Sequence, residues 1–224
     1  VEDRAAQDAA QWRAHGDALH AQGDATGGAE AHLRALAAST RDPAMVAAAH
    51  ALNGGDLPVA ERLLKQQLKN CPTDIGAMRM LAELAIRLGR YGDARALLDR
   101  ALDLAPTFDA ARFARALALS RTNRLSEALE DIDALLAKQP DNLSYLNLRA
   151  TILVRLGDYE AAHALYTRVL DARPDQPKIW MSLGHVLKTM GRTEEGVAAY
   201  RRSLAQRSAL GESWWSLANL KTYR

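Results

Sequence analysis

The side chains with the widest range of possible chemistry are Cys71 and six histidines, at positions 15, 20, 32, 50, 163 and 185. Zinc hydrolases carry two histidines four residues apart around a glutamate, and structural zinc sites add closely spaced cysteines. Neither pattern occurs here. Cys71 lies directly before Pro72, with no histidine nearby in sequence to activate its thiol. We therefore expect an inert thiol, structural or solvated histidines, and no metal, cofactor or catalytic site, so that this chain is not itself an enzyme.

Three arginines recur at one spacing: Arg121 follows Arg87, and Arg155 follows Arg121, by 34 residues each. In a chain of stacked 34-residue units these three would form a column. Guanidinium groups hold carboxylates or phosphates through parallel hydrogen bonds, so such a column suits an extended acidic partner. The alternative is that each arginine lies in the last turn of a helix and complements the dipole of that helix.

Charge and composition exclude several classes of protein. The chain has 29 Lys and Arg against 27 Asp and Glu, a net charge of +2, which leaves neither a polybasic nucleic-acid arm nor an acidic disordered tail. We see no run of about 18 apolar residues and no charged-then-apolar leader, so we expect neither a membrane span nor a secretory signal. The single cysteine excludes an internal disulfide framework and favours a reducing, cytoplasmic compartment.

The sequence contains a 34-residue repeat, which would position the three arginines. Each block contains two segments with apolar residues three and four apart, which is the helical period. A proline cannot continue the second helix, and glycine or asparagine can close the first in a left-handed cap. No pair buries its apolar face alone, so neighbouring pairs must stack. The prolines are Pro72, Pro106, Pro140 and Pro174; the caps are Gly55, Gly89, Asn123, Gly157 and Gly191; small residues for close packing are Ala60, Ala94, Ala128, Ala162 and Gly196.

The pattern resembles the tetratricopeptide repeat, whose signature is W-x2-L-G-x2-Y, then A-x3-F, then P. Trp180 to Gly184 reads WMSLG, followed by Gly191, Gly196 and Tyr200. The resemblance covers nearly the whole chain and implies an all-α fold, a right-handed superhelical solenoid of antiparallel helix pairs in a single array over 1–224. Arg115 and Arg149 replace the usual leucine, and we expect their charged heads at an edge. Repeats are placed at about 9–40, 41–74, 75–108, 109–142, 143–176 and 177–210, with a truncated first helix at 211–224.

In this family the first helix of each pair lines a concave groove, which implies a set of partner-binding residues. The family's carboxylate clamp for acidic chaperone tails needs lysines and asparagines on successive first helices, and no register here fits it. Core-spaced aromatic residues and low net charge also disfavour nucleic acid. The resemblance therefore implies a protein or peptide partner, and an acidic one would suit the arginine column. The implied partner-binding residues are Arg79, Arg87, Arg121, Asn147, Arg155, His185, Lys188, Trp215 and Asn219, beside Glu83, Phe113, Ser120, Thr151, Lys178 and Met181.

The segment from Gly211 to Arg224 carries a second resemblance. Its tandem tryptophans Trp214 and Trp215, followed by Leu-Ala-Asn-Leu-Lys, look like the junction that precedes a sulfotransferase domain in certain bacterial repeat proteins. This resemblance implies that the chain recruits or positions an acceptor for a catalytic domain that follows Arg224 in the parent protein. The alternative is a free-standing adaptor that assembles bacterial protein complexes.

The last predicted helix lacks a following partner helix within the sequence. Its apolar face, including parts of Trp214, Leu217 and Leu220, is therefore expected to be uncovered. We expect self-association through this helix.

Overall fold

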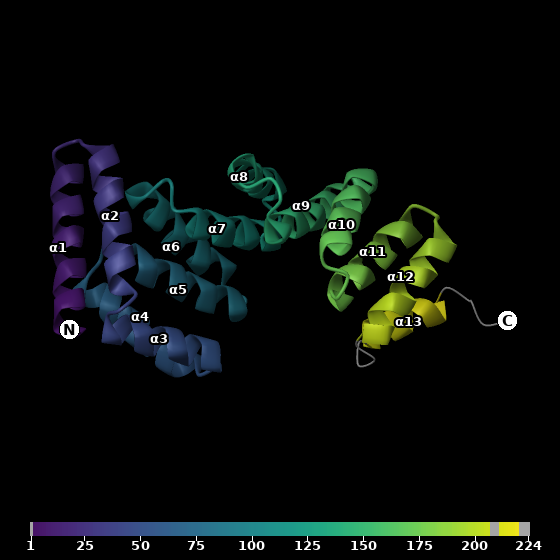
Figure 1. Ribbon diagram of the computed structural model, residues 1–224, viewed down its shortest axis with the longest axis horizontal. Coiled ribbons are helices and arrows are strands. Elements are labelled where there is room, and N and C mark those ends of the chain that lie inside the picture. The colour runs from purple at the N-terminus through teal and green to yellow at the C-terminus, as the bar shows by residue number, and fades with distance from the viewer. Residues whose placement is uncertain (1, 207–210, 220–224) are drawn as a thin grey trace. The chain divides into compact units, whose positions relative to one another are not determined.

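The computed structural model describes residues 2–206 and 211–219, with side chains from residue 7 onward. Within these residues the chain forms thirteen α-helices and no strand, which confirms the predicted all-α fold of helix pairs (Figure 1). The helices are α1 (Glu2–Ala21), α2 (Ala25–Ser39), α3 (Pro43–Gly54), α4 (Leu57–Asn70), α5 (Ile75–Arg87), α6 (Tyr91–Leu104), α7 (Asp109–Arg121), α8 (Leu125–Lys138), α9 (Leu143–Leu156), α10 (Tyr159–Ala172), α11 (Pro177–Thr189), α12 (Thr193–Gln206) and α13 (Gly211–Asn219).

The helix ends follow the residues that the sequence marks as stops. Gly55 and Gly157 cap α3 and α9 with φ of 83° and 87°, and Asn123 takes the same left-handed conformation after α7 with φ of 64°. Asparagine tolerates this region better than other residues with a side chain, so it can stand in for glycine. The four spaced prolines each lie two residues after the end of a second helix, namely α4, α6, α8 and α10. The residues predicted to end the helices of each repeat are confirmed.

The chain divides into two compact units, Val1–Asp131 and Ile132–Arg224. In the first, Ala60 and Leu64 of α4 pack with Leu84 of α5 in a buried cluster. In the second, Tyr166 of α10 and Tyr200 of α12 are among the large buried side chains. A Cβ on Gly184 would lie 2.6 Å from the ring of Tyr200, so only glycine allows α11 and α12 to approach this closely.

The N-terminal hairpin departs from simple stacking. Helix α2 makes its main contacts outside the hairpin with α5 and α6, and Figure 1 shows it lying beside the ends of both. Leu33 and Leu36 pack against the core cluster that contains Ile75 and Phe108. The hairpin therefore packs on α5 and α6, a helix pair that does not directly follow it in sequence.

Three ion pairs hold this hairpin and a later helix pair in place. The Arg13 guanidinium of α1 lies 3.1 Å from the Asp74 carboxylate, which also caps α5 by accepting from the Ala77 backbone amide. Arg115 of α7 donates to Asp131 of α8 at 2.7 and 2.8 Å and to Asp99 of α6 at 3.2 Å. These carboxylates raise the pKa of Arg115 above its ordinary value. We expected the charged head of Arg115 at an edge. It is instead half-buried and paired with carboxylates.

Candidate partner-binding face

Three charged residues, Arg79, Glu83 and Arg87, form a ladder along the exposed side of α5. Their spacing of four places them on consecutive turns of one helix face. The Glu83 carboxylate lies 3.2 Å from the Arg79 guanidinium and 2.6 Å from that of Arg87. One carboxylate serves two guanidinium groups, so the ladder keeps an excess positive charge that a partner carboxylate can meet.

Arg87 also links two helices of the first unit. Its Nη1 donates to the backbone carbonyl of Leu52 at 2.7 Å, in the last turn of α3. A cation there complements the dipole of α3. The alternative role considered for these arginines, in which each complements the dipole of its own helix, therefore extends to a neighbouring helix. Arg87 therefore serves the fold, whereas Arg79 of the same ladder is bonded to Glu83 alone among the described residues.

The other two arginines of the predicted column lie at the ends of α7 and α9. Arg121 is exposed, and in the described part of the chain no carboxylate contacts it. Arg155 is exposed in the last turn of α9, in the second unit. Stacking of Arg87, Arg121 and Arg155 into one column stays a prediction.

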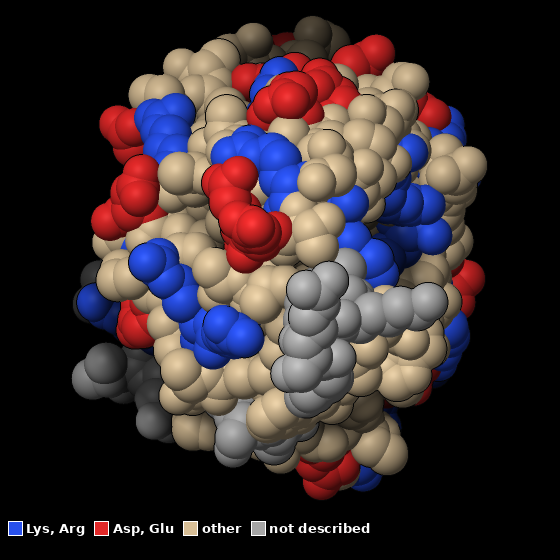
Figure 2. Space-filling model, turned by 90° about the vertical axis from the view of Figure 1, so that its right-hand side faces the viewer, with Lys and Arg blue, Asp and Glu red and all other residues tan. Residues whose placement is uncertain are grey.

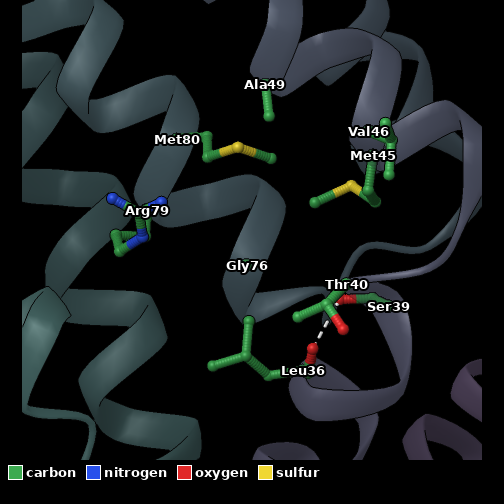
Figure 3. A pocket seen from close by; sticks show the side chains of 9 residues that line it. All are labelled: Leu36, Ser39, Thr40, Met45, Val46, Ala49, Gly76, Arg79 and Met80. Carbon is green, nitrogen blue, oxygen red and sulfur yellow. Dashed lines mark hydrogen bonds between the residues drawn. The ribbon is translucent and has the colours of Figure 1, made fainter. Parts of the chain in front are cut away.

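A pocket opens beside the ladder, between α2, α3 and α5, with a volume of about 250 Å³ (Figure 3). Met45 of α3 and Met80 of α5 extend their side chains toward each other across it, and Arg79 lies at its edge. The C-terminal turn of α2 supplies one wall. A Cβ on Gly76 would lie 2.8 Å from Leu36 Cδ1, so the glycine lets α2 approach α5 closely. The lining residues are Leu36, Ser39, Thr40, Met45, Val46, Ala49, Gly76, Arg79 and Met80.

Two hydroxyl groups of the pocket wall already donate within α2. Ser39 Oγ donates to the Leu36 carbonyl and Thr40 Oγ1 to the Ala37 carbonyl, both at 2.8 Å. The guanidinium of Arg79 is therefore the polar group of this pocket best placed to select a charged ligand. The rest of the lining is mainly apolar.

In the second unit, His185 is engaged inside the protein. Its Nδ1 lies 2.8 Å from the Tyr200 hydroxyl and its Nε2 lies 3.5 Å from a Glu212 carboxylate oxygen. Burial lowers the pKa of His185 below its ordinary value. Lys188 is exposed in the last turn of α11, and Asn147 is half-buried on α9. Of these three predicted residues, Lys188 is the most open to a partner.

The last helix exposes both tryptophans but not its leucine. Trp214 and Trp215 are 51% and 71% exposed, and Asn219 is exposed at the helix end. Leu217 is only 7% exposed because it packs in the cluster with Tyr200 and Leu204. The expectation of an uncovered Leu217 is wrong, since α12 already covers that side of α13. Leu220 lies outside the described residues.

Ser120, another residue implied for the groove, is also placed differently. It is buried and donates to the Leu117 carbonyl within α7. A short polar side chain in the last turn of a helix bonds readily to its own backbone. Ser120 therefore presents no group to a partner.

Models of tetratricopeptide repeats match residues 79–143, 113–177 and 147–211, and a second such model matches residues 51–103. Together they cover well over half of the chain. The chain belongs to the tetratricopeptide repeat family. An uncharacterized protein of Sinorhizobium fredii, y4yS, is 34% identical to this repeat protein over 109 residues, which are 48% of this chain and 59% of y4yS.

Solved repeat structures share the fold at lower sequence identity. A tetratricopeptide repeat protein from Parabacteroides merdae superposes with a TM-score of 0.68 at 15% identity, covering 96% of this chain and 86% of its own. TTC0263 from Thermus thermophilus gives 0.64 at 21% identity, with 79% and 96% covered. MamA from Desulfovibrio magneticus gives 0.63 at 18% identity, with 73% and 92% covered. These likenesses concern the fold alone.

The described residues of this repeat protein form no metal site and no membrane-spanning helix. No group of three or more His, Cys, Asp or Glu side chains there could hold a metal ion, and no described helix is long and apolar enough to cross a membrane. The face shown in Figure 2 carries both basic and acidic side chains. A cytoplasmic location stays a prediction.

Proposed function

We propose that this chain is a protein-interaction scaffold that binds an extended, acidic segment of a partner protein along the first helices of its repeats. The ladder on α5 carries this proposal, because two guanidinium groups share the single Glu83 carboxylate. Exposed Arg121, at the end of the next first helix, adds a second positive point in the same unit. Charge-assisted hydrogen bonds to the ladder and to Arg121 would fix the register of an acidic partner.

Family membership supports a binding role. Stacked repeats present extended surfaces, and these surfaces are what repeat proteins use to bind other chains. The scaffold role assigns no chemistry to Cys71 or to the histidines. The Nδ1 atom of His185 contacts the buried Tyr200 hydroxyl, so we assign His185 to the fold of the second unit rather than to the partner.

Two settings for the scaffold follow from the sequence. In one, the chain is the acceptor-recruiting arm of a larger sulfotransferase-like protein; this setting rests on residues 211–224, whose tandem tryptophans are exposed. In the other, it is a free-standing adaptor. The intact mass of the protein purified from its own cell separates the two. A mass near 24.4 kDa supports the adaptor, and a mass larger by a domain of about 150 residues or more supports the arm.

The binding role is tested by selecting random twelve-residue peptides displayed on phage against the chain. We expect enriched peptides to carry clustered Asp and Glu residues, and to be lost when Arg79 and Arg121 are both changed to Glu. Enrichment of neutral or basic peptides, or equal recovery on the charge-reversed variant, would overturn the proposal. Unchanged circular dichroism and melting temperature of the variant establish that its fold is intact.

A further inference from the structure

We propose that the pocket between α2, α3 and α5 binds one apolar side chain of the partner segment while a carboxylate next to that side chain binds Arg79. This inference rests on the proposed function and names the chemistry that the scaffold selects. The ligand class is an aromatic or branched aliphatic side chain joined by a short spacer to a carboxylate.

The size of the pocket sets the apolar part of the ligand. An apolar cavity of about 150 Å³ in another protein is large enough to hold benzene. The pocket here has about 250 Å³, so it accommodates a phenyl ring or a branched aliphatic group. Burying such a group gains about tenfold or more in affinity.

The lining can adapt to the shape of that group. Met45 and Met80 face each other across the space, and their unbranched thioether chains rearrange more easily than branched side chains (Figure 3). Val46, at the same pocket, is 39% exposed and widens the apolar rim. These features suit a range of apolar groups rather than a single one.

The charge at the edge sets the second part of the ligand. The Arg79 side chain is 30% exposed and shares Glu83 with Arg87, whereas no acidic residue lines the pocket itself. Glu83 lies outside the lining and engages only Nη1 of Arg79, so a ligand carboxylate in the pocket would bind the other N–H groups of the guanidinium. The same arrangement disfavours a ligand with a basic group next to its apolar side chain.

The N-terminal hairpin forms one wall of this pocket. Leu36 and Ser39 of α2, with Thr40 directly after it, form one wall, because the end of α2 packs against α5. The close approach at Gly76 holds that wall against α5. The pocket therefore lies within the first unit, and we expect it to fix the position of a partner segment there.

The test uses the whole chain with its methionine methyl groups labelled with ¹³C, and 3-phenylpropionate as the probe. Methyl signals of Met45 and Met80 should shift on titration, while those of Met181 and Met190 in the second unit should not. We expect 3-phenylpropanol, which has the ring without the charge, to bind about threefold more weakly, as befits a solvent-exposed ionic contact. Absence of shifts at Met45 and Met80 would overturn the inference, and so would equal binding of the acid and the alcohol.

Two variants locate the probe. Ala49→Phe fills the pocket and should weaken 3-phenylpropionate at least tenfold, whereas Ala47→Phe, at an exposed position on the same helix outside the lining, should leave its affinity unchanged. Arg79→Gln should remove the preference for the acid over the alcohol while keeping ring binding. Equal effects of the two alanine variants, at equal melting temperatures, would contradict the pocket.

Failure of this inference is distinct from failure of the proposed function. If acidic peptides are selected and depend on Arg79 and Arg121 but the pocket methyl groups do not respond to the probe, the pocket assignment falls and the scaffold stands. If the probe shifts Met45 and Met80 but no acidic peptide is selected, the pocket is a binding site and the acidic partner is wrong.

Discussion

His20 of α1 and His32 of α2 stack their imidazole rings, with ring centroids 5.4 Å apart, inside the N-terminal hairpin. His20 sits where a Cβ on Gly28 would be 2.6 Å from its ring, and His32 where a Cβ on Gly16 would be 3.0 Å away. Each ring thus lies over a glycine of the opposite helix. His20 Nε2 also lies 3.1 Å from the carbonyl of Leu104 at the end of α6, which ties the hairpin to the repeat at 75–108.

The histidine stack predicts a loss of stability in mild acid. Burial lowers the pKa of His32; neighbouring His20 and Arg13 lower it further, while Asp17 and Asp74 raise it. Because the folded-state pKa lies below the unfolded value of 6.5, the unfolded chain binds the proton first. The contribution of neutral His32 is therefore complete above about pH 6.5 and falls as pH drops through the folded-state pKa. Urea unfolding followed by circular dichroism at pH 7.5 and pH 5.5 measures this loss.

The variant His32→Leu should unfold with a smaller difference in free energy between the two pH values than the wild type. His50→Leu, at an exposed site on α3, should keep the wild-type difference. The lowered pKa of His185 affects both chains equally and cancels in the comparison. An unchanged pH dependence in His32→Leu would contradict the assignment.

The contact between Gly184 and Tyr200 predicts a packing penalty. Gly184→Ala places a methyl group 2.6 to 2.9 Å from three ring atoms of Tyr200, a fully buried side chain, so α11 and α12 must move apart. We expect a loss of about 1–3 kcal/mol in the free energy of unfolding. Gly54→Ala, where no atom lies within 4 Å of the added carbon, should be neutral or slightly stabilising. Similar losses for the two variants would show that the close approach is not what the glycine provides.

Asp131 is predicted to stabilise the first unit more than Asp133 stabilises the second. Asp131 is 3% exposed and pairs with Arg112 and Arg115, whereas Asp133 is exposed and pairs with Arg149. Asp131→Asn leaves two half-buried guanidinium groups poorly compensated and should cost about 2 kcal/mol, after allowing for their remaining contact with water. Asp133→Asn should cost about 1 kcal/mol or less. Equal costs in urea unfolding would count against a structural role for Asp131.

Exposed Trp215 predicts self-association through α13. A side chain that is 71% exposed beside another tryptophan offers an apolar surface to a second copy. Sedimentation velocity should show association that rises with concentration and weakens in Trp215→Ser. Trp12→Ser serves as a control in which another tryptophan is removed. Trp12 is half-buried, and the Arg34 guanidinium covers its ring in the hairpin. A wild-type chain that stays monomeric at high concentration would refute this prediction.

Local sequence signals predicted most of the fold. Gly55, Gly157 and Asn123 closed their helices as expected, because a left-handed cap depends on the capping residue itself. Pro43 and Pro58 lie in the first turns of α3 and α4, where the missing backbone N–H of proline leaves no intrahelical bond unmade. Such signals act over a few residues, so they can be read without knowing what packs where.

Contacts between distant segments could not be predicted in the same way. The sequence indicates a helix pair at about 9–40, but it does not show that α2 lies on α5 and α6 and so forms a pocket. The one local hint is Gly76, a glycine in the first turn of α5 where the next repeat has Ala110. Likewise, the charged groove residues could be predicted from their positions in the repeat. The hydrogen bond from Arg87 to the Leu52 carbonyl could not, because it depends on where α3 ends.

The measurement that tests the scaffold most directly is the affinity of the best selected acidic peptide for two matched double variants, by fluorescence anisotropy. Arg79→Gln with Arg121→Gln removes two charges from first helices, and Arg62→Gln with Lys69→Gln removes two from exposed positions on the second helix α4. We predict that the first pair weakens binding at least tenfold and reduces its dependence on salt, while the second changes affinity by less than about threefold. Equal effects of the two pairs would show that the peptide responds only to overall charge, and would contradict a partner bound along the first helices.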